Sequence, residues 1–573
     1  MSTTPLFDAL WRSGALRTID HALAQSLRRL DPDTPDAVLA AAAMASLAVA
    51  RGHAGFDLAS PRTLVDDALD DDQDIPWPDA DAWQRELAAS RWIATPAIAA
   101  DASDASRPFV LEGAPDAPPL LYLRRYREYE RRVATGLQRL AAQASDTRGV
   151  DLVTGGPGTG KTTTIARLLV QLVEQAHAAG RAAPRIALAA PTGRAAERMA
   201  ESVRNALQSL ATEGTAASVI AALPTSGTTL HRLLGTIPDS PRFRHHADNP
   251  LPFDVVVVDE ASMIDLPLMA KLVEAVPEGA RLVLIGDPDQ LPSVEAGDVL
   301  SGILAAADAG GEAFPARRTH LTHAWRQHDA LQLAPLAAAV REGDSATALS
   351  LLRGGTLSGV HFHEAMADPL QVHGRQPHRD HLLAHWRALA DADSPAQALA
   401  LASRLRLLTA VREGPQGART LNARIETMLS GSGNASSKHF HGRLLLITEN
   451  SYRHRLFNGD IGICLRDADG TVMAWFPGDT PDTPRPFHPA ALPAHDSAFA
   501  MTVHKAQGSE FDEVWLLLPA HDSRVLSREL VYTGITRARR ELHVAGDAAV
   551  IEIALGRHAS RWSGLGWRLK PGN

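Results

Sequence analysis

The stretch Gly155-Gly156-Pro157-Gly158-Thr159-Gly160-Lys161-Thr162 matches the phosphate-binding pattern G-x-x-x-x-G-K-S/T at every position. In such a loop the glycines let backbone N–H groups turn toward phosphate oxygens, and the lysine reaches the β- and γ-phosphates. The hydroxyl after the lysine holds Mg²⁺. A glycine-rich turn that binds nothing is the alternative. The complete match favours a nucleoside triphosphate site in which Lys161 is catalytic, Thr162 binds Mg²⁺ and Thr163 adjoins the phosphates.

Two further groups of polar residues follow expected strands. Asp259 and Glu260 come directly after Val255–Val258, a β-branched run typical of a strand buried on both faces of a parallel sheet. Adjacent carboxylates at a buried strand end repel one another without a cation. We therefore expect Asp259 to bind Mg²⁺ and Glu260 to polarise the attacking water. Gln290 follows the strand expected at residues 282–285, where it can sense the γ-phosphate.

Two arginines outside the phosphate loop are catalytic candidates. Arg326 lies in Trp325-Arg326-Gln327, and Arg537 lies in the stretch 531–539 near the C-terminus. An arginine supplied from elsewhere stabilises charge on the transferring γ-phosphoryl group, an effect worth ~10³–10⁵ in rate. Either arginine alone is more often a surface salt-bridge partner. The presence of the phosphate loop and the acidic pair in the same chain favours the catalytic interpretation for both arginines.

These residues require a parallel sheet. Strands are expected at residues 150–153, 185–190, 255–258 and 282–285, and each ends in one of the polar motifs. After the loop, Ile165, Leu168, Leu169, Leu172 and Val173 fall on one face of a helix. Several strands that are each followed by a polar motif indicate a doubly wound α/β sheet that binds its ligand at the carboxyl edge. We assign this first α/β domain to residues 113–345.

A second set of strand signals predicts a second α/β domain over residues 346–573. Strands are expected at residues 405–409, 513–518 and 541–544. Between them, short strand candidates at 444–447, 461–465 and 472–476 are separated by turn signals such as Asn458-Gly459-Asp460. They predict a small β-barrel, residues 430–498, inserted into the second domain.

Residues 1–112 are expected to form a helical packing or docking domain. Alanine-rich amphipathic segments lie at 7–30, 36–50 and 83–93, and a further helix is expected over 121–144. An acidic cluster between residues 66 and 74 is either a solvated loop or a partner-docking surface, of which the loop is commoner. The basic and aromatic stretch 242–246 suggests a hairpin, which is either an exposed connection or a nucleic-acid contact.

The composition sets bounds on these assignments. A chain of 573 residues, 45% hydrophobic and 21% charged, is ordinary for a soluble protein of about three or four domains. The single cysteine, Cys464, permits no internal disulfide and suits the cytoplasm. No apolar run is long enough to span a bilayer. The net charge of −9 does not indicate a protein that binds nucleic acid through its overall charge, so any such binding needs a local groove.

The order of these motifs resembles that of superfamily 1 helicases. Residues 155–162, 259–262 and 286–294 resemble motifs I to III, residues 191–195 and 229–235 resemble motifs Ia and Ib, and 325–327 resemble motif IV. Residues 502–510 and 531–539 resemble motifs V and VI. The Asp-Glu-Ala-Ser form of motif II is similar to the 5′→3′ branch. The stretches 121–123, 155–165, 259–266 and 412–415 are similar to the RecD family of exodeoxyribonuclease V subunits.

The resemblance implies two RecA-like P-loop domains that bind ATP and Mg²⁺ between them, and an SH3-like inserted barrel. Gln138, 17 residues before Gly155, matches an adenine-contacting glutamine by position, although a lone glutamine is usually a surface residue. Glu510 belongs to the nucleotide site. Single-stranded DNA is expected to contact motif residues of both domains: Thr192, Arg194, His231, Arg232, Thr502 and His504.

The resemblance also implies partners and a pathway. Members of this family act as 5′→3′ DNA helicases with RecB and RecC subunits in double-strand break repair by homologous recombination, and the nuclease centre belongs to RecB. Single-stranded and end-containing double-stranded DNA are the expected substrates. A stand-alone superfamily 1 DNA or RNA helicase is one alternative, because the motor motifs barely discriminate the sugar. An assembly scaffold with a structural nucleotide is the other.

Overall fold

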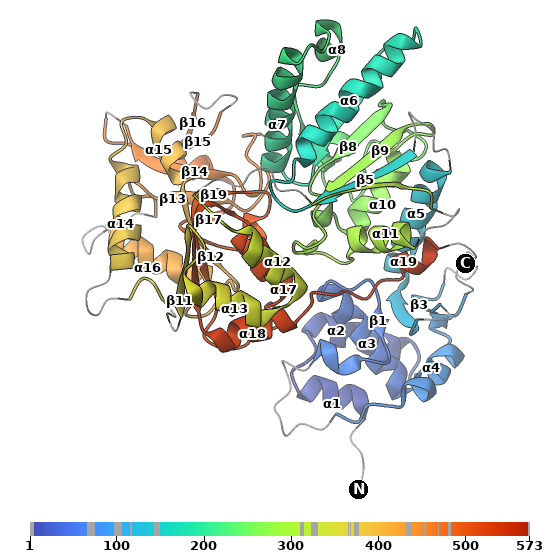
Figure 1. Ribbon diagram of the computed structural model, residues 1–573. Helices are drawn as coiled ribbons and strands as arrows, with labels where there is room; N and C mark the ends of the chain where they lie inside the picture. Colours follow the sequence, from blue (N-terminus) through green and yellow to red (C-terminus); the bar gives the residue numbers. More distant parts are fainter. Residues whose placement is uncertain are drawn as a thin grey trace.

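The computed structural model describes residues 5–65, 75–96, 106–114, 117–142, 149–309, 314–322, 330–364, 366, 368–371, 377–430, 438–451, 453–467, 469–478 and 483–570. The chain forms an N-terminal domain and two α/β domains, which lie side by side above it in Figure 1. Within the described ranges, no helix combines the length and apolarity needed to cross a membrane.

The N-terminal domain contains a sheet as well as helices. Its helices are α1 (Leu6–Arg12), α2 (Thr18–Leu30), α3 (Asp36–Ala50) and α4 (Ala80–Ala89), with a short 3₁₀ turn at Pro61–Leu64. The strand order is β1 (Phe56–Asp57), β4 (Leu120–Leu123), β3 (Phe109–Glu112) and β2 (Ile93–Ala94). Helix α3, residue for residue the predicted one, is almost wholly buried and forms the centre of the core.

The amphipathic segment 7–30 forms two helices, separated by a turn at Gly14, whose φ is 77°. Two predictions for this region need correction. The segment 83–93 ends in strand β2. The predicted helix 121–144 begins only at Arg124, because Leu120–Leu123 pairs antiparallel with Phe109–Glu112 and buries its apolar side chains in the sheet. The acidic cluster 66–74 lies outside the described residues.

The first α/β domain has the predicted parallel sheet, in the order β10-β5-β9-β8-β6-β7. The strands are β5 (Gly149–Gly155), β6 (Ile186–Ala190), β7 (Thr228–Thr229), β8 (Val255–Val258), β9 (Arg281–Gly286) and β10 (Arg317–Leu321). The helices are α5 (Arg124–Ala141), α6 (Lys161–Ala178), α7 (Gly193–Thr212), α8 (Ala217–Ala221), α9 (Leu230–Leu234), α10 (Leu266–Ala275) and α11 (Val299–Asp308), and a 3₁₀ turn spans Ala261–Met263.

Both faces of this sheet are buried, as the β-branched run of β8 predicts. Val255 and Val257 pack with the apolar side chains of α6 and α7 on one face, and Val256 and Val258 pack with those of α5, α10 and α11 on the other. Alternate residues of a strand point to opposite faces, so only a continuous apolar run fits between two helical layers. All six strands are parallel, so their carboxyl ends gather at one edge.

The second α/β domain has a parallel sheet of order β11-β20-β19-β12-β18. The strands are β11 (Val360–Glu364), β12 (Leu405–Thr409), β18 (Ala500–Thr502), β19 (Phe511–Leu517) and β20 (Ala538–Gly546). The helices are α12 (Ala334–Glu342), α13 (Ser345–Gly354), α14 (Pro377–Ala390), α15 (Pro395–Ala402), α16 (Ala418–Ser430), α17 (Arg528–Ile535) and α18 (Ala548–Gly556), with a 3₁₀ turn at His504–Ala506.

The predicted insertion is an antiparallel sheet of order β16-β15-β14-β13-β17 with its own small core. Its strands are β13 (Leu444–Ile447), β14 (Ile461–Arg466), β15 (Val472–Phe476), β16 (Arg485–Phe487) and β17 (His495–Ser497), with a 3₁₀ turn at Pro489–Ala491. The basic stretch 242–246 forms no strand. It makes isolated bridges, Thr236 with Phe243 and His246 with Asn249, and folds against α9.

The C-terminal segment 557–570 departs from the predicted domain assignment. It leaves the second α/β domain after α18 and returns to the N-terminal and first α/β domains, where α19 (Leu565–Arg568) packs on α5 and α11 (Figure 1). The N–H of Ala54 donates to the carbonyl oxygen of Trp562 at 2.8 Å. Arg568 is paired with Glu112 at 2.7 Å and with Glu130 at 3.2 Å, and all three side chains are at most 2% exposed.

Replacing Arg568 by alanine should destabilise the protein by about 3–5 kcal/mol, because two buried carboxylates lose a cation. Urea denaturation of Arg568→Ala measures this. The control, Lys570→Ala, removes an exposed charge two residues away and should change stability by under about 0.5 kcal/mol. A loss below about 1 kcal/mol in Arg568→Ala would contradict a stabilising role for the returning segment.

Candidate nucleotide site between the motor domains

The phosphate loop connects β5 to α6 and is shaped by glycine. Gly158 and Gly160 have φ of 75° and 82°, and Gly160 caps α6, which begins at Lys161. A Cβ on Gly155 would lie 2.6 Å from the carbonyl oxygen of Leu321, so the loop has no room for a side chain there. The first N–H groups of α6 have no partner within the helix and point toward the loop. This arrangement suits a phosphate group.

The Lys161 ammonium lies over the loop. Its Nζ donates to the carbonyl oxygens of Gly155 at 2.5 Å and Gly156 at 2.9 Å. It faces the acidic pair at the end of β8, where its charge partly offsets the burial and the Glu260 charge that raise the pKa of Asp259. A cation held inside the loop in this way can contact both phosphate oxygens and carboxylates.

The acidic pair is under electrostatic and conformational strain. Burial and the neighbouring Glu260 charge raise the pKa of Asp259 to about 6. Glu260 has a φ of 53°, a left-handed conformation that costs a non-glycine residue about 1 kcal/mol or more. Its N–H donates to Asp259 Oδ1 at 2.8 Å. A Mg²⁺ ion between Asp259 and the hydroxyl of Thr162 would relieve the repulsion, so these residues fit the hard cation that accompanies a nucleotide.

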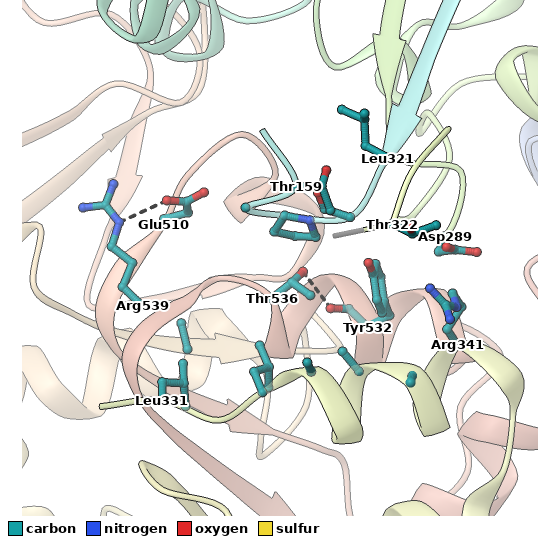
Figure 2. Close-up of a pocket in the computed structure, with 18 of the residues that line it drawn as sticks. Thr159, Asp289, Leu321, Thr322, Leu331, Arg341, Glu510, Tyr532, Thr536 and Arg539 are labelled. Atoms are coloured by element: carbon teal, nitrogen blue, oxygen red, sulfur yellow. Dashed lines mark hydrogen bonds and ion pairs between the residues drawn. The ribbon is translucent and has the colours of Figure 1, made fainter. Parts of the chain in front are cut away.

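Two adjoining cavities lie along the carboxyl edge of the sheet. The first, of about 680 Å³, is lined by the residues of the phosphate loop and by groups from both α/β domains: Thr163, Arg198, Asp259, Glu260, Gln290, Glu510 and Arg537. The second, of about 890 Å³, shares Gly156–Thr159 and Glu510 with the first and extends over α12 and α17 (Figure 2). Together they form a cleft that the loop enters from one side and the second domain closes from the other.

Arg537 enters the cleft from the second α/β domain. Its side chain is held by three groups of the same domain: Nε donates to the carbonyl oxygen of Thr533 at 3.0 Å, Nη1 to that of Ser509 at 3.2 Å, and Nη2 to Thr536 Oγ1 at 3.3 Å. The residue is only 3% exposed. It lines the same cavity as Lys161 and Glu260, so the structure brings the two halves of the predicted site together.

Gln290 stands at the junction of the domains. Its Nε2 donates to Asp287 Oδ2 at 3.0 Å, and the Tyr532 hydroxyl donates to the same oxygen at 3.2 Å. The N–H of Leu291 donates to Thr533 Oγ1 at 2.8 Å, and Gln507 Nε2 donates to the carbonyl oxygen of Leu291 at 2.8 Å. The loop after β9 is therefore hydrogen-bonded to two segments of the second domain.

Arg198 is a site residue that the motifs did not identify. It lies on α7 of the first domain, donates to the carbonyl oxygen of Gly508 at 2.7 Å and is paired with Glu510 at 2.7 Å. Burial opposes ionisation of Glu510, but Arg198 and other nearby arginines lower its pKa to about 2. Arg198 lies one helical turn after Arg194, a predicted DNA contact, and this spacing is the sequence signal that could have identified Arg198 as a site residue.

One predicted nucleotide contact, Gln138, is not brought to the cleft. Gln138 lies near the C-terminal end of α5, donates from Nε2 to the carbonyl oxygen of Arg568 at 3.1 Å and lines neither cavity. The structure therefore does not support the adenine contact, because the end of α5 leads to the amino end of β5 and the phosphate loop follows its carboxyl end. Arg326 lies outside the described residues.

The predicted DNA contacts are dispersed. Arg194 and Arg232 line a cavity of about 570 Å³ between α7 and the inserted sheet, together with Arg406, Phe457 and Arg485. Thr192 caps α7 by accepting from the N–H of Ala195, and Thr502 accepts from the N–H of Lys505. His231 is exposed on α9. His504 is half-buried, and burial together with the Arg561 charge lowers its pKa to about 4.

The fold and the cleft define a P-loop protein built of two α/β domains. Family comparison agrees: the AAA domain matches residues 138–296, the UvrD-like helicase C-terminal domain matches 497–545, and the N-terminal domain of RecBCD enzyme subunit RecD matches 12–115. The chain belongs to the family of RecBCD enzyme subunit RecD, as the relatives below show.

The RecBCD enzyme subunit RecD of Mycolicibacterium smegmatis is 38% identical over 97% of this chain and 98% of its own length. The subunit of the same name from Haemophilus influenzae is 34% identical over 78% of this chain and 74% of its own. The ATP-dependent RecD2 DNA helicase of Deinococcus radiodurans is 32% identical over 71% of this chain and 48% of its own. A solved structure of Bacteroides Pif1 bound to ssDNA is matched over 70% of this chain and 90% of its own, with a TM-score of 0.37 and 16% identity.

Replacing Asp259 by asparagine should stabilise the Mg²⁺-free protein at pH 7.5. The folded-state pKa, about 6, lies above the usual 3.8, so the ionised carboxylate destabilises the fold as pH rises from about 4 to about 6. The gain should be on the order of 2 kcal/mol at pH 7.5 and vanish near pH 4. Urea denaturation at both pH values measures it. Asp248→Asn, which neutralises a 97% exposed carboxylate, should show no such gain.

Proposed function

We propose that this chain is an ATP-dependent 5′→3′ DNA helicase that acts with RecB and RecC subunits in the RecBCD enzyme. The observation that carries the proposal is that Arg537 of the second domain lines one cavity with Lys161, Asp259 and Glu260 of the first. Hydrolysis can then depend on closure of the two domains, which is the requirement of a motor. Family membership supports the same function, since its relatives include an ATP-dependent DNA helicase.

In this proposal each group has one task. Lys161 and the loop N–H groups hold the phosphates, and Thr162 and Asp259 would hold Mg²⁺, which would supply positive charge to neutralise the phosphates. Glu260 orients the attacking water, and Gln290 contacts the γ-phosphate. Arg537 stabilises the transferring phosphoryl group. The larger cavity, with the apolar side chains of Leu331, Leu333, Ala334 and Ala337, accommodates the base and sugar.

Hydrolysis is coupled to domain movement through the bonds that cross the cleft. Loss of the γ-phosphate removes its contacts with Gln290 and Arg537, which leaves the loop after β9 and the Arg198–Glu510 pair to hold the domains together. Single-stranded DNA would then be gripped alternately by the two domains, with Arg194, Arg232 and the SH3-like inserted sheet on its path. Phosphate contacts and stacking without base readout suit such a track.

Replacing Arg537 by alanine should lower the kcat of DNA-stimulated ATP hydrolysis by about 10³-fold or more, while ATP binding changes far less. Single-turnover hydrolysis and fluorescent-nucleotide titration separate the two effects. Arg387→Ala, on the exposed side of α14, removes an arginine of the same domain that lines neither cavity and should leave kcat unchanged. Equal kcat in both variants would remove Arg537 from the site.

Unwinding of tailed duplexes tests the function itself. The chain, alone and assembled with RecB and RecC, should unwind a duplex with a 5′ single-stranded tail, and Lys161→Gln should abolish this activity in the chain alone. In the assembly, comparison with the complex that carries Lys161→Gln isolates the contribution of this chain. Unwinding from a 3′ tail only would contradict the polarity. Stronger stimulation of ATP hydrolysis by RNA than by DNA would favour an RNA helicase, and no stimulation in the assembled complex would favour a scaffold.

A further inference from the structure

A row of imidazole and carboxylate groups crosses one face of the second α/β sheet. His361 of β11 is the register partner of His543 of β20, and His543 is the partner of Trp515 of β19. The rings stack: the centroids of His361 and His543 are 4.6 Å apart, and those of His543 and Trp515 are 4.0 Å apart. Two residues earlier on the same face, Glu541 of β20 is the partner of Glu513 of β19.

This row is unusual for its place in the fold. Strands of a parallel sheet are normally apolar on both faces because helices cover them. Here the exposed side chains of His361 and Glu541 lie beside the half-buried ring of His543. Departures from the local pattern without an evident structural gain are expected where a site has another function. Neither His361, Glu541 nor His543 lines the nucleotide cleft, and α14, which supplies neighbouring histidines, lies on the side of the domain away from the first motor domain (Figure 1).

The ring of His543 is held with one nitrogen available. Its Nδ1 shares a hydrogen bond with His363 Nε2 at 3.0 Å, which fixes the orientation of the ring. Its Nε2 is buried and has no hydrogen-bond partner in the part of the chain that the structure describes. Buried polar atoms are nearly always bonded, so an unbonded ring nitrogen among polar neighbours calls for an explanation.

The groups around this nitrogen have the spacing of a metal site. Glu541 Oε2 lies 3.7 Å and Glu513 Oε1 lies 3.8 Å from His543 Nε2. One ligand atom each from His361, Glu541 and His543 lies within 4.8 Å of the others. Ligands of a tetrahedral zinc ion are about 3.4 Å apart, given bonds of about 2.0–2.2 Å. Small rotations of the two exposed side chains close the remaining distance.

We propose that His361, Glu541 and His543 form a binding site for a transition-metal dication, with Zn²⁺ as the best match. Two imidazole nitrogens and one carboxylate suit zinc and its neighbours in the series, whereas Mg²⁺ prefers an all-oxygen set. A fourth position is left to water or to Glu513. The carboxylate of Glu513 already accepts from Trp515 Nε1 at 2.7 Å and His381 Nε2 at 2.9 Å. His363 serves as the outer partner that orients His543.

The position of the site gives the metal a structural task. Among the described residues, β11 is an edge strand of the sheet and pairs only with β20. A metal bound by His361 on β11 and by Glu541 and His543 on β20 would join the edge strand to its neighbour by bonds other than the backbone ladder. The site is independent of the proposed motor function, since its residues take no part in the nucleotide cleft.

Isothermal titration of the tag-free full-length chain with ZnCl₂, in the presence of excess MgCl₂, tests the proposal. One equivalent should bind, and His361→Ala and Glu541→Gln should each weaken the affinity by at least about tenfold. Both substitutions are of exposed side chains and should leave folding and DNA-stimulated ATP hydrolysis unchanged. The matched controls are His521→Ala and Glu552→Gln, exposed residues of the same domain away from the row, which should bind Zn²⁺ as the original chain does.

A second measurement reads the structural role. Zn²⁺ should raise the thermal midpoint of the original chain and of both controls, and it should not raise that of Glu541→Gln or His361→Ala. No saturable binding, displacement of Zn²⁺ by Mg²⁺, or equal affinity in Glu541→Gln and Glu552→Gln would each overturn the site. A failure here would leave the ATPase and unwinding results untouched, so the two proposals are tested separately.

Discussion

The polar contacts between the two α/β domains are the constraint on which the nucleotide site depends. The loop after β9 is bonded through Leu291 to Thr533 and Gln507, and Arg198 is paired with Glu510 across the same cleft. These groups are buried or half-buried, so breaking one bond leaves an unpaired polar atom at a cost of about 1–3 kcal/mol. This cost helps to keep Arg537 at the cavity that the phosphate loop lines. It is also small enough that the contacts of one phosphate can outweigh it.

The site concentrates charge at a cost to the fold. Burial raises the pKa of Asp259 and of Asp287, and Glu260 occupies a left-handed conformation. Strain of this kind persists only where the surrounding structure enforces it, and it gathers at functional sites. The six-stranded sheet enforces this strain, because its parallel strands place the polar residues that follow them at the same edge. A bound nucleotide and its cation would compensate much of this repulsion.

The returning C-terminal segment makes the N-terminal domain part of the motor. Arg568 joins Glu112 of the N-terminal sheet to Glu130 of α5, while residues 557–564 bridge from the second α/β domain. A movement of the second domain is therefore linked by the chain itself to the N-terminal domain. The buried ion pairs favour one arrangement of this junction, because separating Arg568 from Glu112 and Glu130 would remove a cation from both buried carboxylates.

What the sequence determined by itself is local: the phosphate loop, the strands at Val255–Val258 and Leu405–Thr409, and helix Asp36–Ala50 follow from residue spacing and side-chain shape within one segment. The tertiary structure alone decided which distant segments meet. It directed Gln138 to the carbonyl oxygen of Arg568, turned Leu120–Leu123 into a strand, and placed Arg198 and the His361–His543 row. Local elements follow from the sequence because backbone hydrogen bonding and side-chain spacing act over a few residues. Contacts between distant segments depend instead on how whole layers of helices and strands pack.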